Sequence, residues 1–259
     1  MLLIGEGRIG TALYAAGNAR GVPTALVSRD SGWQALDGPQ GDPVVLCVRN
    51  DDLDEVLARI PDHRREDLVL VQNGAIRDYL SHKGLSRATR GLLYFAVTER
   101  HGAIQPGRTS WFTGPHAAEM AATLTQLGAT SQAIGWPRFT GFEFEKMLWL
   151  VLMGPLCEAH DSDVGTIADA HADQVVALCR ELAPVARASM AVELPAEWLA
   201  EQICDYSRSI PDYRASVKEW AWRNGWMVRT AYAFAVPTPL HHALLRQTGH
   251  MEASDVTES

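Results

Sequence analysis

At 259 residues the chain can bury one large core or two modest ones, and its 47% hydrophobic content is typical of a folded globular protein. A net charge of −8 argues against non-specific binding to nucleic acid. No apolar run approaches the roughly 20 residues that span a bilayer, and the N-terminus has no signal-peptide pattern, so we expect no membrane partner.

The first half of the chain alternates apolar, strand-like runs with segments typical of helices. This alternation is the pattern of βαβ units and predicts an α/β domain with a doubly wound sheet of the Rossmann type. From about residue 142 only helical patterns follow, which predicts an all-α C-terminal domain. The expected strands cover 2–4, 24–28, 44–48, 68–72, 92–98 and 110–114, and the expected helices cover 8–19, 52–59, 76–82, 116–127, 142–159, 172–192, 195–208, 214–235 and 238–247.

The stretch GWPRFTG at 135–141 contains the Gly and Pro residues of a domain boundary. We therefore expect a dinucleotide-binding domain over 1–138 and a helical domain over 139–248. The remaining residues, 249–259, are expected to form a polar, frayed tail.

Three glycines form a GxGxxG pattern between the first expected strand and helix: Gly5, Gly7 and Gly10. In a dinucleotide-binding turn the first permits the tight turn, the second lets the backbone approach a pyrophosphate, and the third allows close packing of helix on strand. The helix that begins with Arg8 and Ile9 offers its amides and positive dipole end to the phosphates. The position between a strand and a helix favours a cofactor site over an ordinary turn.

The end of the second expected strand indicates which dinucleotide is bound. An NAD site usually has Asp or Glu there to accept from the ribose 2′-hydroxyl. This chain has Ser28 and Arg29 at that point, and a guanidinium beside a hydroxyl suits a 2′-phosphate. We therefore predict NADP(H), while Asp30, one residue further on, leaves NAD open.

Further motifs follow in a recognisable order. VLVQNGAI ends a strand with Asn73, FEFEKMLWLVLM places Lys146 on an otherwise apolar helix, and SVKEWAWRNG contributes Glu219 and Asn224. With the glycine turn, these motifs resemble the ketopantoate reductase (2-dehydropantoate 2-reductase) family over nearly the whole chain. The segments YFAVTERHGAIQPGRTSWFTG and VPTPLHHALL are similar to that family's Pro-Gly turn with its closing strand and to its final Pro-x-Pro segment.

The resemblance implies an NADPH-dependent oxidoreductase that transfers hydride to the carbonyl of a 2-keto acid or related small substrate, in a cleft between the two domains. It gives Lys146 the role of general acid. Glu219 would hold a substrate hydroxyl or orient the lysine, and Asn73 would bridge the nicotinamide ribose and the substrate. The family and the apolar content of the helical domain also imply a homodimer through that domain.

The residues alone leave the roles of Lys146 and Glu219 open. A lysine on an apolar helix suits an acid that stabilises a developing alkoxide, because desolvation generally lowers the pKa of an ammonium group. Lys146 could instead extend to the surface or pair with Glu143 or Glu145. Glu219 could be a solvated carboxylate beside Lys218.

Several positions depart from the family pattern where substrate should be held. Leu150 stands where family members carry an Asn, four residues after the lysine. In SRSIPD, Ser207 is kept but Arg208 replaces the family's second Ser, and it could act as a carboxylate clamp. With Asn224, these residues are the expected substrate contacts, and their departures point away from ketopantoate as the substrate.

Two other functions fit the same features. A β-hydroxyacid dehydrogenase or imine reductase also combines a Rossmann domain with a helical domain, and a Trp-rich site suits an imine. A cofactor-binding protein without turnover, acting as a sensor or scaffold, would explain the altered substrate positions. The cysteines and histidines show no metal-ligand spacing, so we expect no metal, reduced thiols and a cytoplasmic protein.

Overall fold

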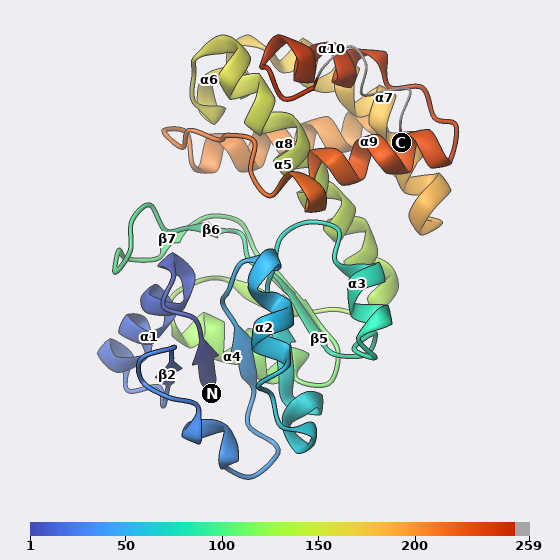
Figure 1. Ribbon diagram of the computed structural model, residues 1–259. Coiled ribbons are helices and arrows are strands. Elements are labelled where there is room, and N and C mark those ends of the chain that lie inside the picture. The colour runs from blue at the N-terminus through green and yellow to red at the C-terminus, as the bar shows by residue number, and fades with distance from the viewer. Residues whose placement is uncertain (252–259) are drawn as a thin grey trace. The chain divides into compact units, whose positions relative to one another are not determined.

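The computed structural model describes residues 1–251, which form two compact units, Met1–Phe139 and Thr140 onward (Figure 1). Most of the expected polar tail, residues 252–259, lies outside the described residues. Within the described part of that tail, the expected fraying is wrong for Met251. Its side chain is buried against Val228 and Leu245, because a methionine is apolar enough to join the core.

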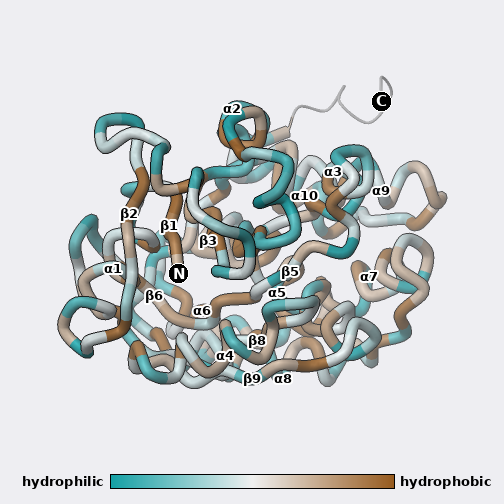
Figure 2. The backbone as a smooth tube through the Cα atoms, turned by 90° about the horizontal axis from the view of Figure 1, so that it is seen from below, coloured by the Kyte–Doolittle hydropathy of each residue, from teal (hydrophilic) through white to brown (hydrophobic). Residues whose placement is uncertain are grey.

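The N-terminal unit contains the predicted Rossmann-type sheet. Its strand order is β2-β1-β3-β4-β5-β8-β9; β1 to β5 pair in parallel, while β8 pairs antiparallel with β5 and parallel with β9. Figure 2 shows β1 and β3 as hydrophobic segments, as expected for strands buried on both faces. The strands are β1 (Leu2–Ile4), β2 (Ala25–Val27), β3 (Val44–Leu46), β4 (Leu68–Leu70), β5 (Thr89–Leu92), β8 (Ser110–Thr113) and β9 (Ser131–Ala133).

Helices cover both faces of this sheet. On one face, α1 (Arg8–Arg20) and α4 (Ala117–Gln126) share a hydrophobic cluster with the strands. Figure 1 shows α2 (Leu53–Leu57) on the other face. The remaining elements are α3 (Arg77–His82), the hairpin β6 (Phe95–Ala96) with β7 (Gln105–Pro106), and the short 3-10 helices η1 (Gln34–Asp37), η2 (Asn50–Asp52) and η3 (Asp62–Asp67).

The expected strand over 92–98 is wrong, because the chain leaves the large sheet after Leu92. The Tyr94 amide donates to the Ser110 hydroxyl at 2.9 Å, and Phe95 then pairs with Pro106 in the hairpin. A continuous apolar run therefore serves two different sheets, which periodicity alone cannot separate.

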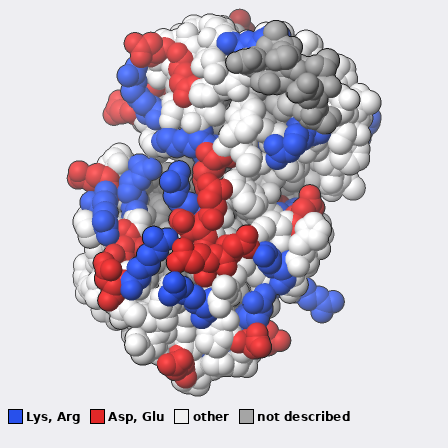
Figure 3. Space-filling view, viewed as in Figure 1, with Lys and Arg blue, Asp and Glu red and all other residues white. Residues whose placement is uncertain are grey.

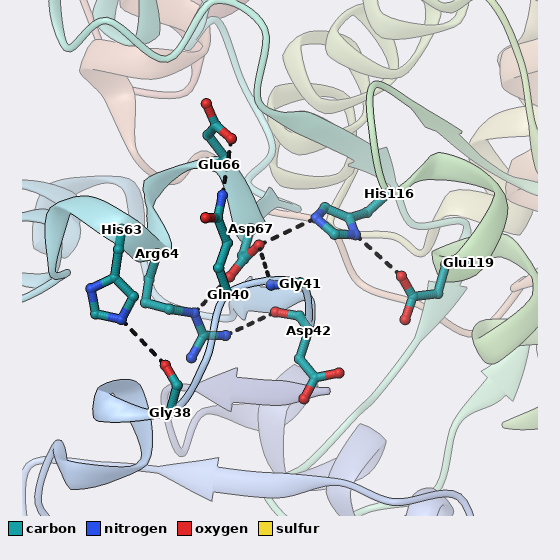
Figure 4. Close-up of polar contacts among 10 residues, drawn as sticks. All are labelled: Gly38, Gln40, Gly41, Asp42, His63, Arg64, Glu66, Asp67, His116 and Glu119. Carbon is teal, nitrogen blue, oxygen red and sulfur yellow. Dashed lines mark hydrogen bonds and ion pairs between the residues drawn. The ribbon is translucent and has the colours of Figure 1, made fainter.

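A buried ion pair fixes the connection between β2 and β3, which contains η1 but no α-helix. Arg64 Nε donates to Asp67 Oδ2 at 2.6 Å, and both side chains are almost completely buried. The Arg64 guanidinium also donates to the Asp42 carbonyl, and Asp67 accepts from the Gly41 amide (Figure 4). His116 approaches the same carboxylate at 3.7 Å. This network lies where β3 and β4 begin, at the edge opposite the glycine turn, and its satisfied partners indicate a structural role.

The C-terminal unit is helical, as predicted. The long helix α5 (Trp136–His160) is buried over most of its length in this unit. It is followed by α6 (Val164–Ala170), α7 (Ala172–Met190), α8 (Ala196–Ser209), η4 (Trp220–Trp222), α9 (Asn224–Ala233) and α10 (Pro239–Gln247). The Asp163 carboxylate accepts from the Thr166 amide at 2.8 Å and caps α6.

The stretch 135–141, expected as a domain boundary, contains the start of α5, and the two compact units divide there between Phe139 and Thr140. The helix begins at Trp136 because Pro137 lies in the first turn, where a missing amide hydrogen costs nothing. The expected helix over 214–235 begins only at Asn224, and residues 214–219 are an irregular connection held against α5.

No helix in the part of the chain that the structure describes is long and apolar enough to cross a membrane. On the face shown in Figure 3, acidic and basic side chains are interspersed over the N-terminal unit. That mixture is typical of a protein surface that faces water.

Candidate active site

The glycine turn has the shape of a phosphate cradle. Gly5 has φ +113°, and a Cβ there would lie 2.8 Å from the Cys47 carbonyl oxygen. A Cβ on Gly10 would lie 1.9 Å from the Gly5 carbonyl oxygen. A Cβ on Gly7, by contrast, would meet only the Cys47 carbonyl oxygen, at 3.7 Å. The first and third glycines are therefore required by packing, whereas the space beside Gly7 is open to a ligand.

The start of α1 is arranged to attract an anion. Gly7 is the N-cap and has no side chain to cap the first-turn amides, and that turn contains no acidic residue. Arg8 is exposed and its guanidinium donates to the Thr98 carbonyl at 3.3 Å, while Ile9 packs against the hydrophobic cluster below. The helix dipole and these amides favour a bound phosphate.

Ser28 and Arg29 follow β2 at the same edge of the sheet. Ser28 is buried, and it exchanges hydrogen bonds with Ser31 through amide and hydroxyl groups at 2.8 and 3.1 Å. The Arg29 guanidinium pairs with Glu55 at 3.1 Å and lies 3.9 Å from Asp52. The Arg29 side chain is 71% exposed, so a 2′-phosphate would compete with two solvated carboxylates for it.

Asn73 follows β4, next to the turn at Gly74, whose φ is +100°. Its carbonyl accepts from the Asn50 side-chain amide at 2.7 Å. Gln72 beside it donates to the Leu46 carbonyl at 2.7 Å, which ties the ends of β3 and β4 together. Because β1 to β4 are parallel, these residues share the carboxyl edge with the glycine turn, where doubly wound sheets bind ligands.

Lys146 is buried on α5, with only 5% of its surface exposed. Its ammonium nitrogen lies 5.6 Å from the centre of the Tyr206 ring, within the range of a cation–π contact. The alternative in which this lysine extends to the surface is therefore wrong. Glu143 and Glu145 are also buried on α5, and Leu150, one turn after the lysine, is half-buried.

One side of α5 holds the connection that carries Glu219. The Arg214 guanidinium donates to both the carbonyl and the carboxylate of Asp161, at 2.6 and 2.8 Å. Burial raises the pKa of the Cys157 thiol, and a hydrogen bond with the backbone of Ala215 partly offsets that rise. Arg214 and Ala215 thus hold the start of this connection against the C-terminal end of α5.

The next residues cross α5 at a glycine. A Cβ on Gly154 would lie 3.0 Å from the Ser216 carbonyl carbon, so a larger residue would have to push this backbone away. The Val217 amide then donates to Glu158 Oε1 at 2.9 Å. Positions spaced by four residues lie on one side of a helix, and Lys146 precedes Gly154 by eight residues. Gly154 therefore lies about two turns after the lysine and roughly 80° round the helix axis from it.

Glu219 has a backbone conformation that few glutamates adopt. Its φ of +47° and ψ of +52° lie in the left-handed region, which costs on the order of 1–3 kcal/mol for a residue other than glycine. Its carboxylate forms a largely buried ion pair with Arg223, four residues later. Such strain persists where surrounding contacts impose it, and it is concentrated at functional sites. Sequence reasoning missed Arg223, although the spacing of four between an acid and a base was a usable signal.

Ser207 does not face solvent. It is completely buried in α8, its hydroxyl accepts from the Trp149 indole at 3.0 Å, and it donates to the Ile203 carbonyl at 2.8 Å. The Trp149 ring also packs against Tyr206 and Tyr213, with ring centres 5.0 and 6.1 Å away. Ser207 therefore anchors an aromatic cluster in the core.

Arg208 lies on the surface between α6 and α8. Its guanidinium donates to Asp169 at 2.8 Å, to Asp205 at 3.3 Å and to the Ala168 carbonyl at 2.9 Å. The hydrogen bond with Asp169 raises the pKa of the Arg208 guanidinium. Through these contacts Arg208 links α8 to α6 at the protein surface.

Asn224 completes a helix that a proline interrupts. Pro155 has no amide hydrogen to give the Val151 carbonyl one turn earlier in α5. The Asn224 side-chain amide donates to that carbonyl at 2.8 Å and lies 3.2 Å from His241 Nε2. Both Asn224 and His241 are completely buried, and burial lowers the pKa of His241 to about 3. Asn224 therefore has a structural partner for its donor group.

No family model matches the chain, and a search of curated proteins finds no relative. Solved structures do match over 96% of the chain. D-mandelate dehydrogenase with NADH and anilino(oxo)acetate matches with 14% identity, 97% coverage of that chain and a TM-score of 0.75. 2-dehydropantoate 2-reductase from Methylococcus capsulatus matches with 18% identity, 95% coverage of that chain and a TM-score of 0.73. A dimeric ketopantoate reductase from Staphylococcus aureus matches with 14% identity, 98% coverage of that chain and a TM-score of 0.67. The chain thus has the fold of ketopantoate reductases, as the sequence motifs predict.

Proposed function

We propose that this protein is a nicotinamide-dependent reductase that transfers hydride to the carbonyl carbon of a small 2-keto acid. The buried position of Lys146 carries the proposal, because a proton donor stabilises the charge that develops on a carbonyl oxygen most strongly where water is excluded. The glycine turn supports a dinucleotide, since its open space lies beside the one glycine that packing does not require.

The proposed mechanism assigns a task to each residue. The bound nicotinamide supplies the hydride when it is reduced. Lys146 donates a proton from its ammonium group to the carbonyl oxygen as negative charge develops there, so that the product is a neutral hydroxyl beside a neutral amine. Glu219 accepts a hydrogen bond from the substrate or orients the lysine, and its fixed backbone lowers the cost of holding that geometry. Asn73 contacts the nicotinamide ribose and the substrate.

For the cofactor we propose NADPH, held by Gly5, Gly7, Gly10 and the start of α1, with Arg29 on the 2′-phosphate. Titration of each cofactor against intrinsic tryptophan fluorescence tests this choice. Arg29→Ala should weaken NADPH binding while leaving NADH binding nearly unchanged, and Glu55→Gln should strengthen NADPH binding by removing a competing carboxylate. Tighter binding of NADH than of NADPH by the wild-type protein would show that the assignment is wrong.

The placement of the expected substrate contacts narrows the substrate class. Ser207, Arg208 and Asn224 are engaged in structural contacts, so we do not retain them as substrate ligands. Two other side chains remain as candidates: Leu150 follows Lys146 by one turn of α5, and the Tyr206 ring lies beside the Lys146 ammonium group. We therefore propose a 2-keto acid whose side chain is apolar or aromatic rather than hydroxylated.

A panel of substrates tests the activity. Purified protein with NADPH should oxidise the cofactor in the presence of 2-keto acids with branched aliphatic or aryl side chains, followed at the nicotinamide absorbance. Turnover of cyclic imines in place of keto acids would establish an imine reductase. Tight cofactor binding with no turnover of any substrate would establish a sensor or scaffold.

We further propose a cytoplasmic homodimer. Three large apolar side chains are about half exposed on α9, α10 and their connection: Tyr232, Phe234 and Leu240. Contiguous exposed apolar residues often mark a protein interface. Sedimentation should give the mass of two chains, and Phe234→Glu should shift the protein toward the monomer. The free thiols of Cys47, Cys157, Cys179 and Cys204 are consistent with a reducing compartment.

A further inference from the structure

We propose that Glu158 is a positioning residue for Glu219, and that His250 near the C-terminus holds Glu158 in place. This inference rests on the proposed function, in which the Glu219 carboxylate acts at the substrate. It assigns a functional contribution to two residues that lie outside every motif described above.

Glu158 joins two distant parts of the chain with its two carboxylate oxygens. Oε1 accepts from the Val217 amide at 2.9 Å, and Oε2 accepts from His250 Nε2 at 2.5 Å. The side chains of Glu158 and His250 are 28% and 30% exposed, so the pair is partly shielded from water. Val217 precedes Glu219 by only two residues.

The backbone of Glu219 explains why such a contact matters. A glutamate in the left-handed region keeps that conformation only where the surrounding structure imposes it. On the C-terminal side, the ion pair with Arg223 and the start of α9 provide that restraint. On the N-terminal side, the hydrogen bond from the Val217 amide to Glu158 restrains the backbone two residues before Glu219. Loss of this bond frees the chain just before the strained residue and turns the Glu219 carboxylate away from its working position.

His250 restricts the rotamer of Glu158. The His250 amide donates to the Leu245 carbonyl at 2.9 Å, which fixes the residue after α10. The next side chain, Met251, is buried against Leu245 and Val228. The imidazole is therefore held in place. A carboxylate that is hydrogen-bonded at both oxygens is held in one orientation more firmly than a carboxylate that is hydrogen-bonded at a single oxygen. The end of the described chain thus supports the segment that carries Glu219.

Two readouts on the full-length protein test the proposal. Hydrogen–deuterium exchange of peptides covering 212–222 reports how strongly the Val217 amide and its neighbours are protected from exchange, and it requires no turnover. Steady-state kinetics with NADPH and the best keto acid report the consequence for Glu219. The variants are Glu158→Ala, Glu158→Gln and His250→Ala, and the matched control is Glu197→Ala, which removes an exposed ion pair with Arg180 elsewhere in the same unit.

In Glu158→Ala we expect faster exchange of the peptides covering 212–222 and a loss of about tenfold in kcat. Misplacing a catalytic group by 1 Å costs up to about 10²-fold, and a smaller displacement costs less. The dissociation constant of this variant for NADPH should be unchanged. Glu158→Gln keeps an oxygen for the Val217 amide and should recover most of kcat, and His250→Ala should fall between the two. Glu197→Ala should match the wild type in both readouts.

The outcomes separate this role from the proposed function. An active wild-type enzyme whose Glu158→Ala variant keeps its kcat overturns the positioning role alone, as does unchanged exchange over 212–222. An equal loss of kcat in Glu158→Gln and Glu158→Ala also overturns the positioning role, because the hydrogen bond that glutamine keeps with the Val217 amide should restore most of kcat. A wild-type protein without reductase activity overturns the proposed function, and the role in catalysis with it.

Discussion

Replacing Asn224 with alanine should destabilise the protein strongly, and a second substitution at Pro155 should relieve part of the loss. The reason is the pairing in which the Asn224 side chain donates to the Val151 carbonyl that Pro155 leaves without a helical donor. Pro155→Ala restores an amide hydrogen one turn after Val151. In that background the carbonyl no longer depends on Asn224.

The magnitude follows from burial. Asn224 is 0% exposed, and a buried carbonyl left without a donor costs about 1–3 kcal/mol. The contact with His241 Nε2 at 3.2 Å is lost as well, and removal of the amide leaves a small cavity. We therefore expect Asn224→Ala to lower the free energy of unfolding by about 2–4 kcal/mol. In the Pro155→Ala background the loss should be smaller by about 1–2 kcal/mol.

Urea unfolding followed by far-ultraviolet circular dichroism measures the four proteins of this cycle. Asn18→Ala is the control, because Asn18 is exposed on α1 and its loss should change stability by less than about 0.5 kcal/mol. Additive effects of the Asn224 and Pro155 substitutions would refute the reasoning. Such additivity would mean that Asn224 does not serve the carbonyl that the proline leaves open.

Two further predictions concern the glycine turn and a buried histidine. Gly10→Ala should prevent stable folding, because its methyl group would meet the Gly5 carbonyl oxygen, whereas Gly7→Ala should melt like the wild type and yet lose most NADPH binding. Equal affinities of Gly7→Ala and wild type for NADPH would contradict this assignment. Since burial lowers the pKa of His241 to about 3, the unfolded chain takes up a proton below about pH 6.5 that the folded protein does not. The free energy of unfolding should therefore fall as pH falls. Between about pH 6 and pH 4 it should fall by about 2 kcal/mol more in the wild type than in His241→Gln. Parallel plots of the free energy of unfolding against pH for the two proteins would contradict this prediction.

Most of the N-terminal fold could be predicted because local pattern and tertiary role agree there. The strands are apolar runs bounded by turn residues, and Gly5, Gly7 and Gly10 stand where a strand must turn tightly into a helix. The prediction failed at residues 214–219, where helical spacing competes with a tertiary contact. Close approach to Gly154 and hydrogen bonds to α5 hold these residues in an irregular conformation.

The candidate site was predictable only where one residue type has one plausible task. Lys146 stood out because lysine is rare on an apolar helix, and the structure places it in the interior. Ser207 and Asn224 are polar residues that the core uses for its own hydrogen bonds, and no spacing distinguishes that use from substrate binding. Glu158 was missed because its partner His250 lies 92 residues away in the sequence.

The central claim is that a buried lysine protonates a carbonyl during hydride transfer. The most direct measurement is kcat for NADPH oxidation with the best 2-keto acid in Lys146→Ala, beside Lys218→Ala as an exposed-lysine control. We predict that Lys146→Ala lowers kcat by roughly 10²–10⁴-fold, the range typical of a lost general acid, and that Lys218→Ala stays near the wild type. A Lys146→Ala enzyme with the kcat of the wild type would contradict the mechanism.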